Sequence, residues 1–327
     1  MAVRILSEAE LREVVAIEPG SLAAVEEAFT WLADGLVNMP PIMHIEVGKN
    51  GDIDAKGGYV QGQPGAVIKI AAGFYGNPAR GLPSGSGLMI VLDAETGRAQ
   101  AILLDNGYLT NLRTGLAGAV AARHLAREDA TVAGVIGAGA QARFQIHSLQ
   151  LVRPLARLLV WSRSRENAER YAAEMGDALG IPVAVAASAE AVVRESDVVV
   201  TTTQSREPLI DAAWLHPGLH ITAMGSDFPA KQELAPEVLA GADLVVVDRR
   251  AQCALLGELH HALDAGALAP DDPRVIELGE VTSGRAPGRT SAEQITVCDL
   301  TGTGVQDVAI ALRALALATE RGYGREV

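Results

Sequence analysis

The stretch VAGVIGAGAQARFQ, residues 132–145, decides the fold of this chain. It opens with an apolar run that lacks polar alternation, which is typical of a strand covered on both faces of a parallel sheet. A glycine turn follows, and the residues from Ala140 onward have the composition of a helix. Strand, glycine turn and helix in this order predict a Rossmann-type, doubly wound α/β domain.

The glycine turn has the pattern G-x-G-x-x-A, formed by Gly137, Gly139 and Ala142. The first glycine permits the tight turn, the second lets a pyrophosphate approach the backbone, and the small alanine lets the helix pack closely on the strand. A glycine turn also serves as a plain connection between strand and helix, but its position here favours dinucleotide binding. Further residues that we assign to this cofactor site are Ala140, Gln141 and Thr202.

The end of the next strand, WSRSRE at residues 161–166, indicates which dinucleotide is bound. An acidic residue at this point bonds the ribose 2′-hydroxyl of NAD, whereas an arginine accommodates the 2′-phosphate of NADP. Ser162, Arg163 and Arg165 precede the first acid, Glu166. The cofactor prediction is therefore NAD(P)(H), with NADP(H) favoured. The alternative is that both arginines are solvated residues before a helix.

Outward from this unit, apolar strands alternate with helical segments from about residue 125 to about residue 300. The strands are ARLLVWS, PVAVAAS, VVVTTT, HITAMG and DLVVVD. Their spacing is typical of βαβ units, which predicts an open, doubly wound parallel sheet.

The part of the chain before the predicted parallel sheet has a different pattern of apolar and turn-forming residues. Residues 39–107 contain short apolar runs separated by Gly, Pro, Asn and Asp, which predicts antiparallel strands joined by hairpin-length turns. Helices are expected to begin at Ser7 and at about residue 21, and another covers residues 109–126.

The last segment, GVQDVAIALRALALATERGYG, has helical periodicity, and we expect no strand after it. This helix is expected to pack back on the N-terminal region, so that one domain is discontinuous. We predict a substrate-binding and dimerisation domain of α+β type, residues 1–120 plus 305–327, and a Rossmann domain, residues 121–304.

Composition excludes several classes of protein. The chain has 327 residues, with 27 Lys and Arg against 40 Asp and Glu, a net charge of −13 that argues against a nucleic-acid partner. Its 49% of hydrophobic residues indicates a folded protein, and we see neither a signal peptide nor an apolar run of about 18 residues, so no membrane partner is expected. Cys253 and Cys298 form no C-x-x-C pair, which disfavours a disulfide framework and a thiolate metal site and fits a cytoplasmic location.

Several motifs together resemble the ornithine cyclodeaminase and mu-crystallin family over nearly the whole chain. They are VIKIAAGFYGNPARGLPSGSGLMIVLDAETG, LLDNGYLTNLRTGLAGAVAARHLA, VIGAGAQARFQ, AMGSDFPAKQEL and LTGTGVQDVAIA. The segments MPPI, LLDNGYLT and GAVAARHLA also resemble sequences of the cyclodeaminase branch associated with ectoine utilisation.

The resemblance implies a homodimer whose N-terminal domain, completed by the C-terminal helix, binds a small amino-acid or imino-acid substrate. It implies an NAD(P)-dependent enzyme that moves a hydride at a carbon bearing nitrogen, as ketimine and pyrroline-2-carboxylate reductases do. One alternative is an ammonia lyase like ornithine cyclodeaminase, acting on a diamino acid with catalytic NAD. Another is a non-catalytic, NADPH-binding protein like a crystallin.

The same resemblance implies roles for individual residues. Lys69 and Arg113 are similar to the family residues that contact the substrate carboxylate, and Asp227 to the aspartate that receives the substrate amine. A snorkelling lysine, an exposed arginine and a helix-capping aspartate are the competing interpretations. Residues that the resemblance places near the nicotinamide, the substrate or the cofactor are Ser84, Thr114, Lys231 and Asp299.

One departure from the family pattern concerns the substrate. Where relatives usually have a second carboxylate-binding arginine, this chain reads MPPIMHIEV, with Met43 and His44. The substrate therefore differs from ornithine, or His44 holds it instead. His260 and His261 lack nearby acids in a metal-binding spacing, so no metal site is predicted and a helix surface is expected for them.

Overall fold

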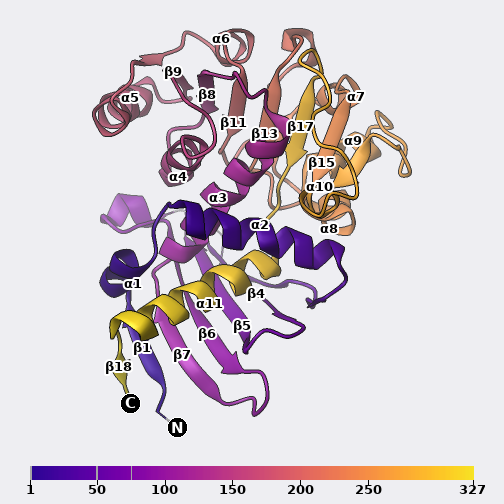
Figure 1. Ribbon diagram of the computed structural model, residues 1–327. Coiled ribbons are helices and arrows are strands. Elements are labelled where there is room, and N and C mark those ends of the chain that lie inside the picture. Colours follow the sequence, from indigo (N-terminus) through magenta and orange to yellow (C-terminus); the bar gives the residue numbers. More distant parts are fainter. Residues whose placement is uncertain (1, 49–50, 75) are drawn as a thin grey trace. The chain divides into compact units, whose positions relative to one another are not determined.

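A computed structural model of the chain describes residues 2–48, 51–74 and 76–327 (Figure 1). Its contacts divide the chain into two compact units. Unit 1 consists of Met1–Arg113 and Thr303–Val327, and unit 2 is Thr114–Gly302. The chain therefore passes between the units twice, once inside a helix and once just before the last helix.

Unit 1 is built on a sheet with the strand order β18-β1-β7-β6-β5-β4-β2, and β3 pairs with β4. The strands are β1 (Arg4–Ser7), β2 (Val37–Asn38), β3 (Met43–Val47), β4 (Gly51–Val60), β5 (Gly65–Phe74), β6 (Gly85–Asp93), β7 (Ala99–Leu104) and β18 (Arg325–Glu326). A short 3-10 helix, η1 (Asn77–Arg80), precedes β6. Strands β3 to β7 pair in antiparallel fashion, which confirms the prediction for residues 39–107.

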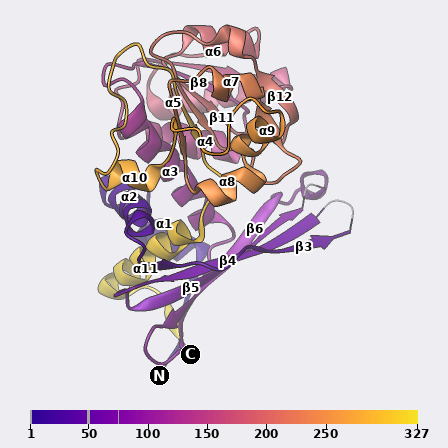
Figure 2. The same ribbon diagram turned by 90° about the vertical axis from the view of Figure 1, so that its right-hand side faces the viewer.

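The helices of unit 1 are α1 (Glu8–Val14), α2 (Pro19–Ala33) and α11 (Gly304–Arg321). Figures 1 and 2 show α11 across one face of the sheet, beside α2. The helix predicted at Ser7 is confirmed, because the Ser7 hydroxyl caps α1 and Glu10 completes a capping box. The terminal helix packs on β4 and β5 within this unit, and the predicted division into a substrate-binding and a Rossmann domain stays a prediction.

The expectation of no strand after α11 is wrong. Gly322 adopts a φ of 74° and ends the helix, and the Tyr323 N–H donates to the Ala318 carbonyl at 2.8 Å. The chain then turns, and β18 pairs antiparallel with β1. A strand of two residues has no detectable periodicity, which is why the sequence pattern does not reveal it.

Unit 2 is built on a parallel sheet with the order β10-β9-β8-β11-β13-β17-β15-β16. Its strands are β8 (Val132–Ile136), β9 (Arg157–Trp161), β10 (Val183–Val185), β11 (Val198–Thr201), β13 (His220–Ala223), β15 (Leu244–Val247), β16 (Val275–Glu277) and β17 (Thr296–Asp299). Every pairing in this sheet is parallel, which confirms the Rossmann-type fold. A separate pair, β12 (Arg206–Ile210) and β14 (Gln232–Leu234), lies outside it.

Helices cover both faces of this sheet. They are α4 (Ala140–Leu149), α5 (Arg165–Leu179), α6 (Ala189–Glu195), η2 (Ala212–Trp214), α7 (Pro236–Ala240), α8 (Arg250–Leu256), α9 (Glu258–Asp264) and α10 (Leu278–Thr282). Val135 and Ile136 are neighbours in β8, yet they belong to different hydrophobic clusters. Adjacent residues of a strand point to opposite faces, so each face carries its own apolar layer.

The helix α3 (Tyr108–Leu125) carries the chain from unit 1 into unit 2. Arg153 donates to the carbonyls of Ala122, Arg123 and Ala126 near its end, and Arg289 donates to that of Leu125. Guanidinium groups at this end favourably oppose the helix dipole. None of the described helices combines the length and the apolar composition that crossing a membrane requires.

Candidate functional site

The clearest cluster of charged groups is buried inside unit 1. Asp307 Oδ2 lies 2.8 Å from Lys69 Nζ, and Asp307 Oδ1 accepts a hydrogen bond of 2.9 Å from Arg113 Nε. Arg113 Nη1 also donates to Gln306 Oε1 at 2.7 Å. Lys69 is 2% exposed and Asp307 is 0% exposed. We call Lys69, Asp307 and Arg113 the cation cluster.

Local structure explains how the cluster is assembled. Lys69 points from β5 to the buried face, whereas its neighbour Ile68 is 42% exposed on the other face. A Cβ at Gly304 would lie 2.7 Å from the Gly57 carbonyl, so α11 can begin this close to β4 only with glycine there. The same first turn of α11 then places Asp307 next to Lys69.

Electrostatic interactions keep Asp307 ionised and bring the pKa of Lys69 close to neutral pH. Burial, with smaller contributions from the charges of Arg113 and Lys56, lowers the pKa of Lys69 to about 8 against the opposing effect of Asp307. Burial by itself raises the pKa of Asp307, yet Lys69 and Arg113 outweigh that effect and hold it below its usual range. A lysine with this pKa can give up or take a proton near neutral pH.

Sequence reasoning found Lys69 and Arg113 but missed Asp307 and Gln306. Both lie in the quoted stretch LTGTGVQDVAIA, yet that segment predicts only an apolar terminal helix. The available signal was the acid at an inward position of an otherwise apolar helix face, since such an acid is rarely fully buried without a partner.

The glycine turn of unit 2 fits a dinucleotide. Gly137 has a φ of 112°, and a Cβ there would lie 2.7 Å from Thr202 Oγ1. At Gly139 a Cβ would have no atom within 4 Å, so space is open above the backbone. Gly139 is the N-cap of α4 and supplies no capping side chain, and Ala140 behind it is exposed. A pyrophosphate can bind where the backbone is accessible and the N-terminus of a helix is not capped by a side chain, as at Gly139 and α4. Gln141 follows in the first turn.

Arg143 stabilises this turn by hydrogen bonds, a role that sequence reasoning did not predict. Its Nη1 donates to the carbonyls of Ala138 and Gly139 at 3.0 and 2.9 Å. Its Nε donates to Glu174 of α5 at 2.8 Å. The ion pair therefore ties the glycine turn to the neighbouring helix.

After the end of β9, the two predicted arginines differ in their ion pairs. Arg165 is engaged by Glu169 at 2.8 Å within α5. Arg163 is exposed, and across the described residues no ion pair involves its guanidinium. Ser162 comes just before it, and Ser164 caps α5. Both arginines are exposed, so what distinguishes them is the ion pair of Arg165 with Glu169.

Asp227 follows β13 at the carboxyl end of the parallel sheet. Its carboxylate is exposed and lies 2.5 Å from Lys231 Nζ. The helix-capping interpretation of Asp227 is wrong, because a turn and then β14 follow it rather than a helix. A carboxylate and an ammonium are thus held together where ligands of such sheets bind.

The other predicted contacts are spread over both units. Ser84 is exposed before β6 in unit 1, and its carbonyl accepts from the Phe74 N–H at 2.7 Å. Thr114 is buried in α3 in unit 2, and its carbonyl accepts from Gln145 Nε2 at 2.9 Å. Their proximity to a nicotinamide stays a prediction.

Three remaining residues have structural partners. His44 Nδ1 lies 2.7 Å from the Asp54 carboxylate on the neighbouring strand. His261 is half-buried on α9, with its Nε2 bonded to the Lys231 carbonyl. Asp299 accepts from the Leu259 N–H at 2.9 Å, and burial raises its pKa to about 7.

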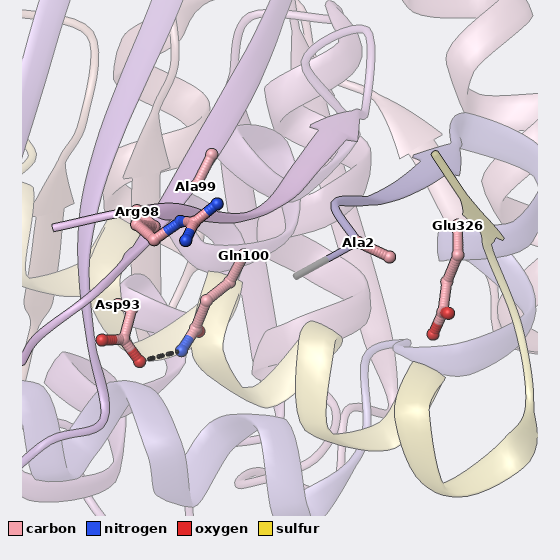
Figure 3. A pocket seen from close by; sticks show the side chains of 6 residues that line it. All are labelled: Ala2, Asp93, Arg98, Ala99, Gln100 and Glu326. Carbon is pink, nitrogen blue, oxygen red and sulfur yellow. Dashed lines mark hydrogen bonds between the residues drawn. The ribbon is translucent and has the colours of Figure 1, made fainter. Parts of the chain in front are cut away.

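A pocket at one end of the unit 1 sheet contains none of the predicted residues. Figure 3 shows its lining by Ala2, Asp93, Arg98, Ala99, Gln100 and Glu326. Asp93 is already bonded to Gln100 and to the turn at Thr96. Nothing in this pocket provides a reactive group.

Comparison with known proteins adds the family context. The model of the ornithine cyclodeaminase/mu-crystallin family matches residues 2–316. The chain is similar to the Δ1-pyrroline-2-carboxylate reductase of Thermococcus litoralis, solved with NADH and L-proline, with a TM-score of 0.94, 30% identity and coverage of 99% of this chain and 100% of that one.

Two further solved structures are similar over nearly their whole length. An archaeal alanine dehydrogenase dimer with bound NAD has a TM-score of 0.92 and 35% identity, covering 100% of this chain and 99% of that one. The iminosuccinate reductase of Paracoccus denitrificans with NAD⁺ has a TM-score of 0.91 and 32% identity, covering 100% and 99%.

Proposed function

The chain belongs to the ornithine cyclodeaminase/mu-crystallin family, and on this premise we propose that it reduces the C=N bond of a small imino acid. It is an enzyme that binds a nicotinamide cofactor, as do the solved relatives. The observation that carries the proposed reaction is the buried cation cluster of Lys69, Asp307 and Arg113.

The cation cluster suits a carboxylate next to a reacting C–N bond. Asp307 and Gln306 engage Nε and Nη1 of Arg113, and within the described residues its Nη2 makes no hydrogen bond. A guanidinium held from one side can grip a carboxylate with the other. Lys69, protonated below about pH 8, can add a charge-assisted hydrogen bond.

The reaction needs a hydride on carbon and a proton on nitrogen. When bound, the reduced nicotinamide supplies the hydride. Lys69 supplies the proton to the imine nitrogen, and Asp307 keeps its ammonium oriented. The C=N bond thereby becomes CH–NH, and one reduced cofactor is consumed for each amino acid formed.

We propose NADP(H) as the preferred cofactor because of Arg163. This residue follows β9, where the sheet presents the ribose-binding position, and an exposed guanidinium there suits a 2′-phosphate. Substitution Arg163→Ser is the variant that tests the preference.

We also propose a homodimer that uses strand β3. Met43, Ile45 and Val47 are 58%, 45% and 38% exposed, an apolar row that water disfavours. The family resemblance and the dimeric state of the archaeal alanine dehydrogenase support pairing through this strand-rich part.

A second candidate, a cyclodeaminase with catalytic NAD, is favoured by Asp227. Its exposed carboxylate beside Lys231 provides a base where a substrate amine could be deprotonated. Such an enzyme would release ammonia from a diamino acid without net change in the cofactor.

The deciding experiment follows nicotinamide absorbance with Δ1-pyrroline-2-carboxylate and NADPH, then NADH. Loss of absorbance equal to the proline formed supports the reductase, and Lys69→Met should abolish it. Ammonia release from ornithine or diaminobutyrate with catalytic NAD would instead support the cyclodeaminase. Tight NADPH binding without either reaction would support the crystallin-like alternative.

A further inference from the structure

We infer that Arg143 is a positioning residue for the cofactor, because its guanidinium sets the orientation of the peptide groups in the glycine turn. The inference goes beyond the proposed reaction, since it concerns how the dinucleotide is held and not which imino acid is reduced. It rests on the assignment of this turn to the pyrophosphate of the cofactor.

The guanidinium of Arg143 reaches back from α4 to the turn that precedes this helix. Side chains of a helix lean toward its N-terminus, so a long side chain at this position can cover the turn. Arg143 Nη1 donates to the Ala138 carbonyl at 3.0 Å and to the Gly139 carbonyl at 2.9 Å. Both carbonyls are therefore held toward the side on which Arg143 lies.

The geometry of the peptide group converts this into an orientation of N–H groups. The C=O and N–H of a planar trans peptide point in opposite directions. The Ala138 carbonyl shares its peptide group with the Gly139 N–H, and the Gly139 carbonyl shares its own with the Ala140 N–H. Because Arg143 holds both carbonyls on one side, both N–H groups are directed to the other. N–H groups at the start of a helix have no acceptor inside it, so these two are suited to the oxygens of a pyrophosphate.

Two residues of α5 keep the guanidinium in place. Arg143 Nε and Nη2 donate to the two carboxylate oxygens of Glu174 at 2.8 and 2.5 Å, a bidentate pair with a fixed plane. Arg143 Cζ also lies 5.1 Å from the ring centroid of Tyr171. Tyr171 is fully buried, and its hydroxyl donates to the Ala142 carbonyl at 3.1 Å, so the surface under the guanidinium is itself fixed.

These contacts favour an indirect role for Arg143 over direct contact with a phosphate. All three guanidinium nitrogens already donate, two of them to Glu174 and one to the turn. The hydrogen bond from Arg143 lowers the pKa of Glu174, and the charges of Arg143, Arg170 and His147 act in the same direction, so the pair is ionic. With its charge balanced by Glu174, Arg143 acts on the cofactor through the geometry of the turn.

The test measures binding of NADPH and of NADH by fluorescence titration without substrate. Arg143→Met should raise Kd about tenfold, the factor expected for the loss of one hydrogen bond to a charged group. The factor should be the same for both nucleotides, because they share the pyrophosphate. Arg143→Lys should be nearly as weak, since one ammonium cannot replace a planar fork that contacts the turn and Glu174 together. Wild-type affinity in Arg143→Met or Arg143→Lys would overturn the inference.

Glu174→Gln separates the indirect role from a direct contact with phosphate. If Arg143 positions the turn, loosening its guanidinium should raise Kd for NADPH, by about threefold for a weakened ion pair at the surface. A direct phosphate ligand would be freed by the same substitution, so Kd would fall. A fall in Kd would therefore overturn the inference.

A fragment without a pyrophosphate provides a readout that general damage to the site would change. Adenosine 2′-monophosphate, measured by competition with NADPH, should bind wild type and Arg143→Met equally well. Equal weakening of the fragment and of NADPH would overturn the inference, because the substitution would then act on the whole nucleotide site.

Arg170→Met is the matched control. It removes an exposed cation from the same helix, one turn before Glu174, whose bonding partner is Asn167 and not the glycine turn. Its Kd for NADPH should equal that of the wild type, and a loss as large as in Arg143→Met would overturn the inference. A failure to reduce any imino acid would refute the proposed reaction alone, since binding is measured without substrate. A wild type that binds neither NADPH nor NADH would overturn the inference whatever the reaction.

Discussion

At the scale of single residues, Asp307 acts on the charge state of Lys69, on which the proposed chemistry depends. It contacts both predicted substrate-binding cations, although it lies 194 positions from Arg113 in sequence. Its charge stabilises the protonated form of Lys69, which burial destabilises. The protonation state of Lys69 therefore depends on a residue that need not touch the substrate.

The pH dependence of activity should report Lys69. Because the protonated form is fully present only below its pKa of about 8, kcat/KM for imine reduction should fall as pH rises through about 8. In Asp307→Asn the pKa of Lys69 should be lower, since the stabilising charge is lost, and the fall should begin at lower pH. A pH–rate profile of both proteins measures this; a fall at unchanged or higher pH in the variant contradicts it.

The same variant should be less stable. Removing Asp307 leaves two buried cations without their shared counter-charge, a change that costs about 3 kcal/mol in comparable buried pairs. Denaturant unfolding of Asp307→Asn should show this loss, and Asp307→Glu should recover part of it. Unaltered unfolding would mean that the cations find another partner.

Arg163 should favour NADPH over NADH. One charged hydrogen bond to a phosphate contributes about 1.5 kcal/mol or more, so Arg163→Ser should raise KM for NADPH relative to that for NADH about tenfold. Arg165→Ser, in which the lost partner is Glu169, should change the ratio little. Equal effects of the two substitutions would remove the basis for assigning Arg163.

At the scale of elements, the turn between β8 and α4 has two glycines with different reasons to be glycine. Gly137 needs its positive φ and its closeness to Thr202, so it is a requirement of folding. Gly139 has ordinary backbone and open space, so we propose that its lack of a side chain serves cofactor binding. One motif thus contains a structural and a functional position.

Alanine substitutions should separate the two positions. Gly137→Ala should lower the free energy of unfolding by about 2 kcal/mol, because a side chain there is strained and meets Thr202. Gly139→Ala should leave unfolding nearly unchanged but weaken binding of NADPH, measured by fluorescence titration. Equal losses of stability in both variants would contradict this division.

At the scale of the whole molecule, assembly depends on the exposed row of β3. Ile45→Lys should shift the protein from dimer to monomer in light scattering, because it buries a charge in the proposed interface. Glu46→Lys, on the opposite side of the same strand, is the matched control and should remain dimeric. A dimer that persists in Ile45→Lys would place the interface elsewhere.

Local patterns of the sequence determined the parallel sheet of unit 2, the glycine turn and the antiparallel strands of unit 1. Each depends on residues that are neighbours in the chain: apolar runs set strands, and glycines such as Gly137 permit the turn. The resemblance added Lys69 and Arg113, which the structure brings together on a common partner.

Only the tertiary structure decided which residues complete the cluster. Asp307 reaches Lys69 because α11 packs on β4 and β5, and Lys56 faces Lys69 because of the register of two strands. The short strand β18 likewise exists through its pairing with β1. These features arise from contacts between segments far apart in the chain, and periodicity or spacing within one segment carries no record of them.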